Sequence, residues 1–313
     1  QVAGLIGAQP DEITFTSGGT ESINAALKGI AESKGGGHIV STAVEHPAAM
    51  ESLAWLAGRG CTFTLVGVDS LGMVNPAEVR RASKADTMLS SVMHAQNEVG
   101  TIEPVEEIGR IAREVKIPFH VDAAQSAGKI AVDVERFNAD LLTIAGHKLY
   151  APKGIGALYV REGVKLAPFI HGAAQEGGRR AGTENVALAV GLGAAAQISH
   201  RHMDDPRMQE LRDYFWQGLS KRFGPKVALN GHSTTRLPNT VNVSFLGHRG
   251  GTILEQCDGL CASTGAACHA DEVTPSAVLS AMGVGLERAE GAIRFSLGRP
   301  TTREQVDTVL GLL

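Results

Sequence analysis

Short apolar runs alternate with longer stretches of helical periodicity over residues 1–160. In the longer stretches, 21–33, 47–60 and 105–116, apolar side chains recur at helical spacing, which predicts helices. The short runs are rich in β-branched residues and predict strands. Repeated strand and helix units predict an α/β fold with a mostly parallel sheet and helices on both of its faces. The expected strands cover 12–17, 38–43, 62–68, 87–93, 117–123, 140–146 and 157–160.

The pattern changes near Asn185, where a long helical stretch leads into a charged and polar segment. We expect this region to connect a large domain over 1–205 to a smaller α+β domain over 206–313. The last helix is expected to begin at Thr301, because Glu304 stands three residues later in the spacing of a capping box. The other elements expected in the smaller domain are strands over 239–247 and 292–298 and a helix over 274–283.

Two strand ends carry the most informative residues of the chain. Asp122 closes one expected strand, and Lys148 follows the next strand along the chain. Ligands of a parallel α/β sheet bind at the carboxyl ends of the strands. A lysine there can form an imine with an aldehyde cofactor, and a nearby aspartate can keep a pyridine nitrogen protonated so that the ring withdraws electrons. The pair predicts a pyridoxal phosphate site, against the alternative that Lys148 is a solvated lysine past a strand.

A phosphate site is expected where the first strand meets the helix over 21–33. Gly19 and Thr20 stand at this junction, within the sequence TSGGTES. The helix N-terminus supplies backbone N–H groups and a favourable dipole, and Thr20 adds a hydroxyl. A Gly-Gly turn between strand and helix is common, so this signal gains its weight from its place before Asp122 and Lys148.

Three further polar side chains lie just beyond expected strands. His46 precedes Pro47 at a helix start, where an imidazole can either stack on a pyridine ring and move protons or simply cap the helix. Asn97 and Gln125 carry amides that can hydrogen-bond a ring hydroxyl or satisfy the backbone of their own loops. Both interpretations stay open for each residue.

Arg294 lies inside an apolar strand pattern, where an unpaired charge is costly. A buried arginine therefore needs a carboxylate. That partner is either structural or belongs to a bound amino acid, since the guanidinium group matches carboxylate geometry.

Cys268 lies in a stretch of small and acidic residues, which predicts an accessible loop and a reactive thiol. The alternative is a zinc site made from Cys257, Cys261, Cys268 and His269. Its spacing fits none of the standard zinc patterns, and Cys257 falls within a helical pattern.

Composition narrows the class of protein. The chain has 29 Lys and Arg residues against 33 Asp and Glu, so its net charge of -4 predicts no direct contact with nucleic acid or an anionic membrane. Hydrophobic residues make up 43% of the chain but form no uninterrupted run of the roughly 18 residues that a membrane span requires. Four cysteines are too few for a disulfide framework, so a reducing compartment, the cytoplasm, is expected.

The first residues open directly on helical periodicity, without an initiator Met or a signal-peptide pattern. We therefore expect that an N-terminal segment is missing from the large domain, and that any targeting segment upstream is not visible in this sequence.

With these residues in place, the chain resembles the cysteine desulfurases and their close relatives the selenocysteine lyases, which are pyridoxal phosphate enzymes of fold type I in the class V aminotransferase group. The resemblance runs from about Asp11 to Leu313. The motifs that carry it stand in family order: FTSGGTES, VEH, NEVGTIEP, HVDAAQSAGK, GHKLYAPKGIGALYVR, QEGGRRAGTEN, LPNTVNVSF, STGAAC and IRFSLGR.

The resemblance implies a role for each predicted site residue. Lys148 would hold the cofactor aldehyde and Asp122 its pyridine nitrogen, while His46 would stack on the ring. Arg294 would bind the substrate carboxylate, Asn97 would also contact the substrate, and Cys268 would accept the sulfur. The remaining roles are those of Gln125 and Asn97 at the ring hydroxyl, and of Gly19, Thr20, His147 and, from the other subunit of a homodimer, Thr183 at the phosphate.

Some positions depart from the family pattern. Gln96 replaces the first residue of the usual Asn-Asn-Glu, and Ala145 replaces a serine that often touches the phosphate, which implies one phosphate contact fewer. The usual triple glycine before Gln-Glu reads Gly-Ala-Ala over 172–174, which implies a changed pocket wall on the dimer side. The Asp-x-Asn-Ala-Thr-Thr type of motif near the family's N-terminus is absent.

The activity that the resemblance implies is conversion of L-cysteine to L-alanine, with the sulfur left on Cys268 as a persulfide. A sulfur-acceptor protein is the expected partner, in a pathway such as iron–sulfur cluster assembly or tRNA thiolation. Three alternatives stay open: a selenocysteine lyase acting on L-selenocysteine, an aminotransferase, and a non-catalytic sulfur-carrier or zinc-binding scaffold. The aminotransferase would have no need of Cys268.

Overall fold

The structure of the protein is a computed structural model. It describes the backbone of residues 1–203, 205–264, 267–269, 272–274 and 276–313, and no side chain between 265 and 275. The chain divides into two compact units. Unit 1 comprises Gln1–Gly67, Val74–Ala95 and Glu103–Met203, and unit 2 comprises Val68–Met73, Gln96–Ile102 and Asp204–Leu313.

Unit 1 is built on a seven-stranded sheet with the strand order β1-β7-β6-β5-β4-β2-β3. The five strands from β6 to β3 in this order run parallel, whereas β7 is antiparallel to both of its neighbours. The predicted α/β fold with a mostly parallel sheet is confirmed. The strands are β1 (Ile13–Thr16), β2 (His38–Thr42), β3 (Thr62–Val66), β4 (Thr87–Met93), β5 (Phe119–Asp122), β6 (Leu141–Ala145) and β7 (Gly156–Val160).

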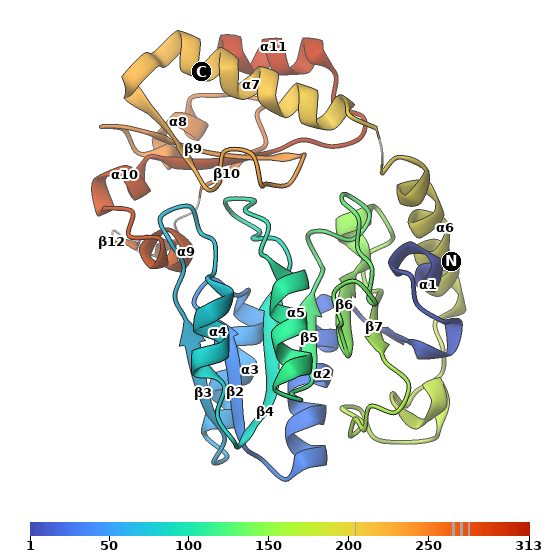
Figure 1. The fold of residues 1–313 in the computed structure, drawn as a ribbon. Helices are drawn as coiled ribbons and strands as arrows, with labels where there is room; N and C mark the ends of the chain where they lie inside the picture. The colour runs from blue at the N-terminus through green and yellow to red at the C-terminus, as the bar shows by residue number, and fades with distance from the viewer. Residues whose placement is uncertain (204, 265–266, 270–271, 275) are drawn as a thin grey trace. The chain divides into compact units, whose positions relative to one another are not determined.

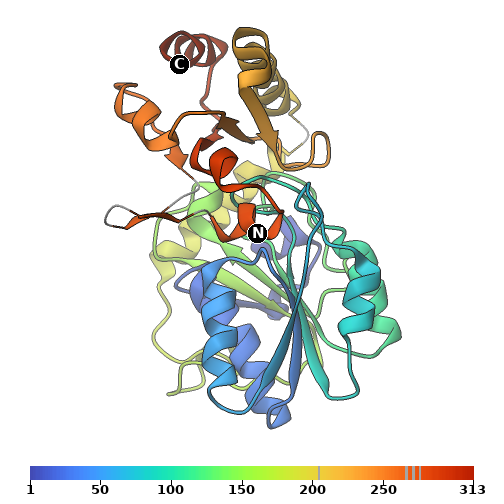
Figure 2. The same ribbon diagram turned by 90° about the vertical axis from the view of Figure 1, so that its left-hand side faces the viewer.

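Helices cover both faces of this sheet. Figure 1 shows α4 and α5 on the face toward the viewer, and Figure 2 shows α2 and α3 on the opposite face with the strands in between. Every residue of β2, β4, β5, β6 and β7 is buried, as expected for strands enclosed by helices on two sides. The helical elements of unit 1 are α1 (Val2–Ile6), η1 (Pro10–Glu12), α2 (Gly19–Lys34), α3 (Pro47–Ala57), α4 (Pro76–Ala82), α5 (Val105–Glu114), η2 (Gly146–Leu149), η3 (Gln175–Gly178) and α6 (Val186–Arg201).

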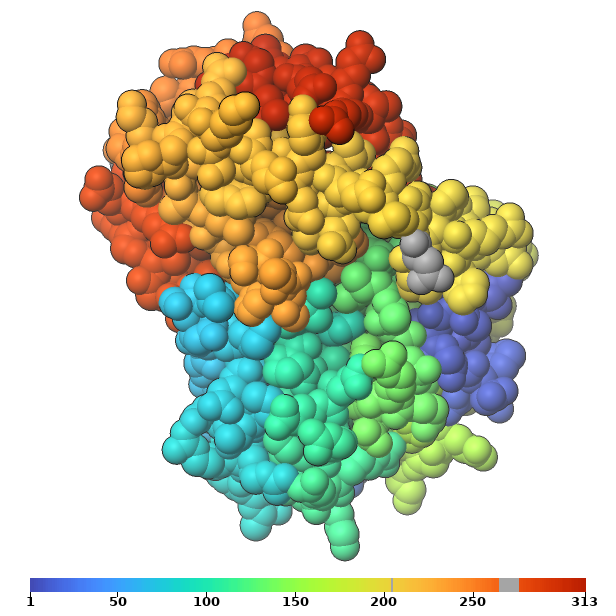
Figure 3. All heavy atoms as spheres, turned by 45° about the horizontal axis from the view of Figure 1, so that its top comes forward, coloured from blue at the N-terminus to red at the C-terminus, as the bar shows by residue number. Residues whose placement is uncertain are grey.

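Unit 2 contains an antiparallel sheet with the strand order β10-β13-β9-β8. Phe215 of α7 and Val306 of α11 belong to the same apolar core as Val243 and Phe295 of the strands. The two helices lie side by side in Figure 3, α7 in yellow to orange and α11 in red. The elements are α7 (Arg207–Phe223), η4 (Gly224–Lys226), β8 (Val227–Asn230), β9 (Thr240–Phe245), α8 (Gly250–Glu255), β10 (Ser263–Thr264), β11 (Ala267–His269), β12 (Glu272–Thr274), α9 (Ala277–Ala281), α10 (Leu286–Glu290), β13 (Ala292–Ser296) and α11 (Arg303–Leu312).

The start of the last helix differs from the sequence prediction by one residue. The cap of α11 is Thr302, whose side chain accepts from the backbone N–H of Gln305, while the Gln305 side chain accepts from the backbone N–H of Thr302. Thr301 instead accepts from the backbone N–H of Gly298. The expected box of Thr301 and Glu304 was wrong because the adjacent pair, Thr302 and Gln305, has the same spacing and an equally suitable chemistry.

All helices in the described residues are too short or too polar to cross a lipid bilayer.

Candidate active site

The carboxyl ends of β5 and β6 place the predicted lysine and aspartate at the same edge of the sheet. Asp122 is the last residue of β5 and pairs with Thr143 on the parallel strand β6. β6 ends at Ala145, and Lys148 follows at once in the 3-10 helix η2. Gly146 at this turn has no room for a side chain, because a Cβ there would lie 2.6 Å from the carbonyl oxygen of Ile155. The tight turn therefore fixes where Lys148 leaves the strand.

Asp122 is a buried carboxylate that a nearby positive charge would stabilise. Its side chain is only 4% exposed, and its Oδ1 accepts a hydrogen bond of 2.9 Å from the backbone N–H of Ala124. Burial raises the pKa of Asp122 to about 6, against the opposing effect of that hydrogen bond. Among the described residues Asp122 forms no ion pair. A protonated ring nitrogen would supply the missing positive charge.

His46 begins α3 and lies within electrostatic range of Lys148. Its Nδ1 accepts from the backbone N–H of Ala48 at 3.0 Å, and Pro47 occupies the first helical position. An accepting Nδ1 requires that the proton of the neutral ring sit on Nε2. Desolvation by the surrounding protein lowers the pKa of His46, and the positive charge of Lys148 lowers it further. The ring is therefore neutral near pH 7 and offers Nε2–H as a donor.

The N-terminus of α2 lies where the sequence predicts a phosphate site. Gly18 has a φ of 153°, which favours glycine, and among the described residues no side chain caps the helix. The first backbone N–H groups of α2 therefore remain available to an anion. Gly19 lies against the end of β6, since a Cβ at this position would come within 3.1 Å of the Ala145 Cβ. Thr20 and His46 line the same hollow, of about 660 Å³.

His147 and Gln125 complete the predicted group in unit 1. His147 precedes Lys148 in η2, and its pKa is lowered by desolvation and then by the positive charges of Lys148, Lys153 and Lys129. Gln125 lies in the turn after β5 and accepts two hydrogen bonds from Lys129. The structure thus collects these side chains around the ends of β5 and β6.

Thr183 lies apart from this group. It is exposed and lines a different hollow of unit 1, together with Glu176 and Arg180. Arg180 forms an ion pair with Glu21 on the first turn of α2. Within the described residues of this one chain, Thr183 does not share the hollow of Thr20 and His46.

Asn97 and Arg294 meet within unit 2. Arg294 lies on β13 and donates from Nη1 to the backbone carbonyl of Asn97 at 2.8 Å. Its Nε is buried without a hydrogen-bond partner in the described residues. The side chain of Glu98 is hydrogen-bonded to Ser276, and burial raises its pKa while the charge of Arg294 lowers it. Arg294 therefore retains an unused donor for a carboxylate.

The candidate sulfur acceptor can be placed only by its backbone. Cys268 lies on β11, opposite Val273 on the antiparallel strand β12. Its side chain lies outside the described residues, as does that of His269. Cys257 is buried and Cys261 is exposed. In the part of the chain that the structure describes, no group of His, Cys, Asp and Glu side chains is arranged to hold a metal ion.

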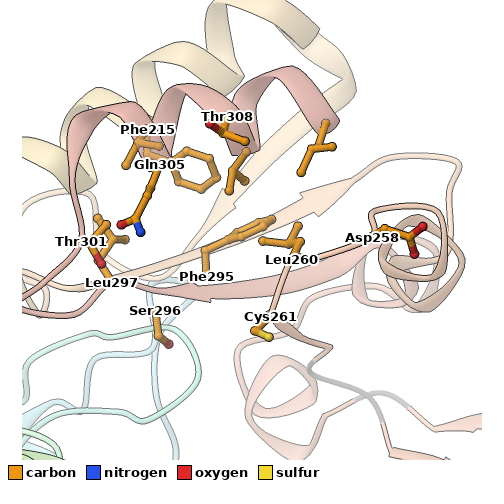
Figure 4. A pocket seen from close by; sticks show the side chains of 14 residues that line it. Phe215, Asp258, Leu260, Cys261, Phe295, Ser296, Leu297, Thr301, Gln305 and Thr308 are labelled. Atoms are coloured by element: carbon orange, nitrogen blue, oxygen red, sulfur yellow. The ribbon is translucent and has the colours of Figure 1, made fainter.

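An open cavity of about 510 Å³ in unit 2 involves none of the residues predicted to bind the cofactor or the substrate (Figure 4). It lies between α11 and β13, and its lining is mostly apolar, with the side chains of Phe295 and Leu260 next to each other. Among the described residues, its lining contains no lysine that could form an imine with an aldehyde cofactor, and no arginine or histidine that could bind a phosphate.

Comparisons with known proteins settle the family. Residues 1–309 match the family described as Aminotransferase class-V. The chain is 48% identical over 319 residues to a cysteine desulfurase IscS from Dictyoglomus turgidum, an alignment that covers 100% of this chain and 81% of the relative. It is also 48% identical over 316 residues to a cysteine desulfurase IscS from Methanosarcina thermophila, covering 99% of this chain and 78% of the relative. The chain belongs to the cysteine desulfurases.

Solved structures confirm the fold type of this desulfurase. A "NifS-like protein" superposes with a TM-score of 0.92 and 39% identity, covering 99% of this chain and 83% of that chain. The structure described as "SspA in complex with cysteine" superposes with a TM-score of 0.83 and 36% identity, covering 95% of this chain and 84% of that chain.

Glu45, a buried acid next to His46, was not singled out by the sequence analysis. Glu45 is 6% exposed, and its Oε1 accepts from the Thr42 hydroxyl at 2.7 Å and from the Met93 backbone at 3.0 Å. Burial raises its pKa to about 8, with those hydrogen bonds opposing the shift and the negative charges of Asp122 and Glu103 adding to it. The only sequence signal was its place directly before His46.

We expect Glu45→Gln to change how stability depends on pH. Between pH 5 and 8 the folded protein retains a proton on Glu45 that the unfolded chain releases, because the folded pKa is raised. This group therefore makes the wild-type free energy of unfolding fall by about 1.4 kcal/mol per pH unit over that window. Glutamine does not titrate, so the variant lacks this loss.

Urea denaturation of both proteins from pH 5 to 9 measures the effect. The free energy of unfolding of the variant should rise relative to that of the wild type as the pH rises. The difference between the two should level off above about pH 8. Parallel stability profiles would show that Glu45 is ionised in the folded protein.

Proposed function

We propose that this protein converts L-cysteine to L-alanine and transfers the sulfur to Cys268 as a persulfide. The observation that supports this most strongly is the geometry at the ends of β5 and β6. There Asp122 and Lys148 leave neighbouring parallel strands, and His46 lies within electrostatic range of the lysine. Membership of the cysteine desulfurases supports the same reaction.

Pyridoxal phosphate fits the residues of this site. Asp122 is a buried carboxylate with a raised pKa, which suits a protonated pyridine nitrogen. The uncapped N-terminus of α2 suits a phosphate, with Thr20 as a further donor. Gln125 would bind the ring hydroxyl, and Lys148 would form the covalent link to the aldehyde. When bound, the cofactor supplies an electron sink for the charge that develops at the substrate's α-carbon.

The side chains of the protein would bind the substrate and move its protons. The Lys148 amine would be the base that removes the α-proton of the substrate. His46 is neutral and presents Nε2–H, which suits a group that stacks on the ring and exchanges protons beside it. Arg294 would bind the substrate carboxylate through its unused Nε–H.

The sulfur step uses the thiolate of Cys268. It attacks the sulfur of the substrate, a new S–S bond forms, and the C–S bond of the substrate breaks. The electron pair of that bond remains with the three-carbon product, which takes up protons and leaves as alanine. One cysteine and one thiol thus give one alanine and one persulfide, with no external oxidant or reductant.

We further propose that the enzyme works as a homodimer in the cytoplasm and passes its sulfur to an acceptor protein. The position of Thr183 supports the dimer, because this residue lies apart from the hollow of Thr20 and His46 within one chain. A second copy could bring its Thr183 to the phosphate. The small number of cysteines supports a reducing compartment.

Substitution of Arg294 should weaken substrate binding selectively. Loss of a hydrogen bond to a charged group costs about 1.5–3 kcal/mol, so we expect Arg294→Gln to raise KM for L-cysteine roughly 10- to 100-fold. Steady-state kinetics would measure this. Arg249→Gln, at an exposed arginine before α8, is the matched control and should leave KM unchanged. An unchanged KM in Arg294→Gln would remove Arg294 from the substrate site.

The proposed reaction is tested by its stoichiometry. Purified protein loaded with pyridoxal phosphate is mixed with L-cysteine, and alanine and protein-bound persulfide are quantified over a single turnover. We expect alanine and persulfide in equal amounts. Alanine without persulfide would contradict the proposal, as would turnover of L-selenocysteine alone.

A further inference from the structure

Lys129 makes two contacts with the proposed ring-binding residue Gln125. Its Nζ donates to the Gln125 side-chain oxygen Oε1 at 3.0 Å and to the Gln125 backbone carbonyl at 2.8 Å. Both residues belong to the turn that follows β5, and both side chains are half-buried. The paired contacts tie the lysine to one side of the amide and to its main chain.

These contacts fix the direction of the amide. An ammonium group has three donors and no acceptor, so the amide atom that faces Lys129 must be the oxygen. The NH₂ end of Gln125 therefore points away from Lys129. Without the lysine, no hydrogen bond in the described part of the chain would hold the side-chain amide of Gln125 in this orientation.

The positive charge of Lys129 also acts on His147, which lies next to Lys148. It contributes to the lowered pKa of His147, which directly precedes Lys148 in η2. Lys153 contributes to the same shift but makes no hydrogen bond to Gln125 in the described structure. The two lysines therefore share an electrostatic effect and differ in the contact with the amide.

We infer that Lys129 is a positioning residue that turns the NH₂ group of Gln125 toward the ring oxygen of the cofactor. This inference rests on the proposed function, because it takes Gln125 to be the partner of that oxygen. An amide that donates stabilises the ionised ring oxygen, whereas an amide that presents its own oxygen repels it. Lys129 thus favours the ionised ring oxygen of the bound cofactor indirectly, by orienting the amide of Gln125.

The test follows the visible absorption of the bound cofactor as a function of pH. Lys129→Met keeps the length of the side chain and removes the donor. Loss of an oriented hydrogen bond to a charged oxygen is worth about 1.5 kcal/mol or more, so the pH midpoint of the absorption change should rise by about one unit. The dissociation constant of pyridoxal phosphate from the protein should rise about tenfold. Lys129→Arg keeps a charged donor and should stay closer to the wild type than the Met variant.

Two controls separate positioning from a general effect of charge. Lys153→Met removes the matched charge, and its midpoint shift should be clearly smaller than that of Lys129→Met. In a Gln125→Ala background, Lys129→Met should shift the midpoint no more than Lys153→Met does in the wild type, because there is no amide left to orient. Thermal unfolding of each variant checks that the fold is intact.

Several outcomes would overturn the inference. An unchanged midpoint in Lys129→Met would do so, as would an equally large shift in the Gln125→Ala background or an equal shift in Lys129→Arg. All of these leave the proposed function in place, since the wild type still binds the cofactor. Failure of the wild type to bind pyridoxal phosphate would instead remove the proposed function itself.

Discussion

Replacement of Lys148 by alanine should abolish turnover and the covalent attachment of pyridoxal phosphate. The variant loses both the amine that links to the aldehyde and the base that removes the α-proton. A positioned base alone contributes about 10²–10⁴-fold to a rate. Because the variant also loses the covalent link to the cofactor, we expect kcat to fall by more than about 10³-fold. Alanine formation from L-cysteine measures the rate, and mass spectrometry after borohydride reduction measures the attachment.

The matched control for this substitution is Lys153→Ala. Lys153 is an exposed lysine five residues along the same segment, and its charge also acts on His147. It should retain most of the wild-type rate. Substantial turnover by Lys148→Ala would show that another amine carries the reaction.

Replacement of Cys268 by alanine should stop persulfide formation while the cofactor remains bound. The substituted position has no thiol to attack the sulfur, so alanine release should fall by about 10³-fold or more, as expected when a covalent nucleophile is removed. The absorbance of the bound cofactor should be retained, because the residues proposed to hold it are unchanged. Quantification of alanine and of protein-bound persulfide after addition of L-cysteine measures the effect.

Cys261 provides the control, because it is an exposed thiol in the same unit. Cys261→Ala should form the persulfide at close to the wild-type rate. Normal sulfide release from L-cysteine by Cys268→Ala would refute the role proposed for Cys268, and loss of the persulfide in Cys261→Ala would transfer that role to the other thiol.

The sequence predicted the parts of the fold that depend on local pattern. The strands that end at Asp122 and Ala145 are fully buried and appear in the sequence as short, mostly apolar runs. The parallel order then places their carboxyl ends together, which brings Lys148 to the edge where Asp122 lies. The sequence motifs and the sheet topology therefore both place Lys148 and Asp122 at the same edge of the sheet.

Contacts between residues far apart in the sequence could not be predicted in this way. The donation from Arg294 to the Asn97 carbonyl joins positions 197 residues apart, and no periodic pattern contains it. The raised pKa of Glu45 depends on burial among neighbours from three other segments, including Asp122 and Glu103. The segments 68–73 and 96–102 belong to unit 2, although they precede the expected boundary at 205 by more than a hundred residues.

Borohydride reduction tests most directly whether Lys148 forms the covalent link to the aldehyde of pyridoxal phosphate. The loaded protein is reduced, digested and mapped by mass spectrometry. We expect the stable adduct on the peptide of η2, at Lys148. An adduct at a different lysine, or a folded protein that takes up no pyridoxal phosphate, would contradict this assignment.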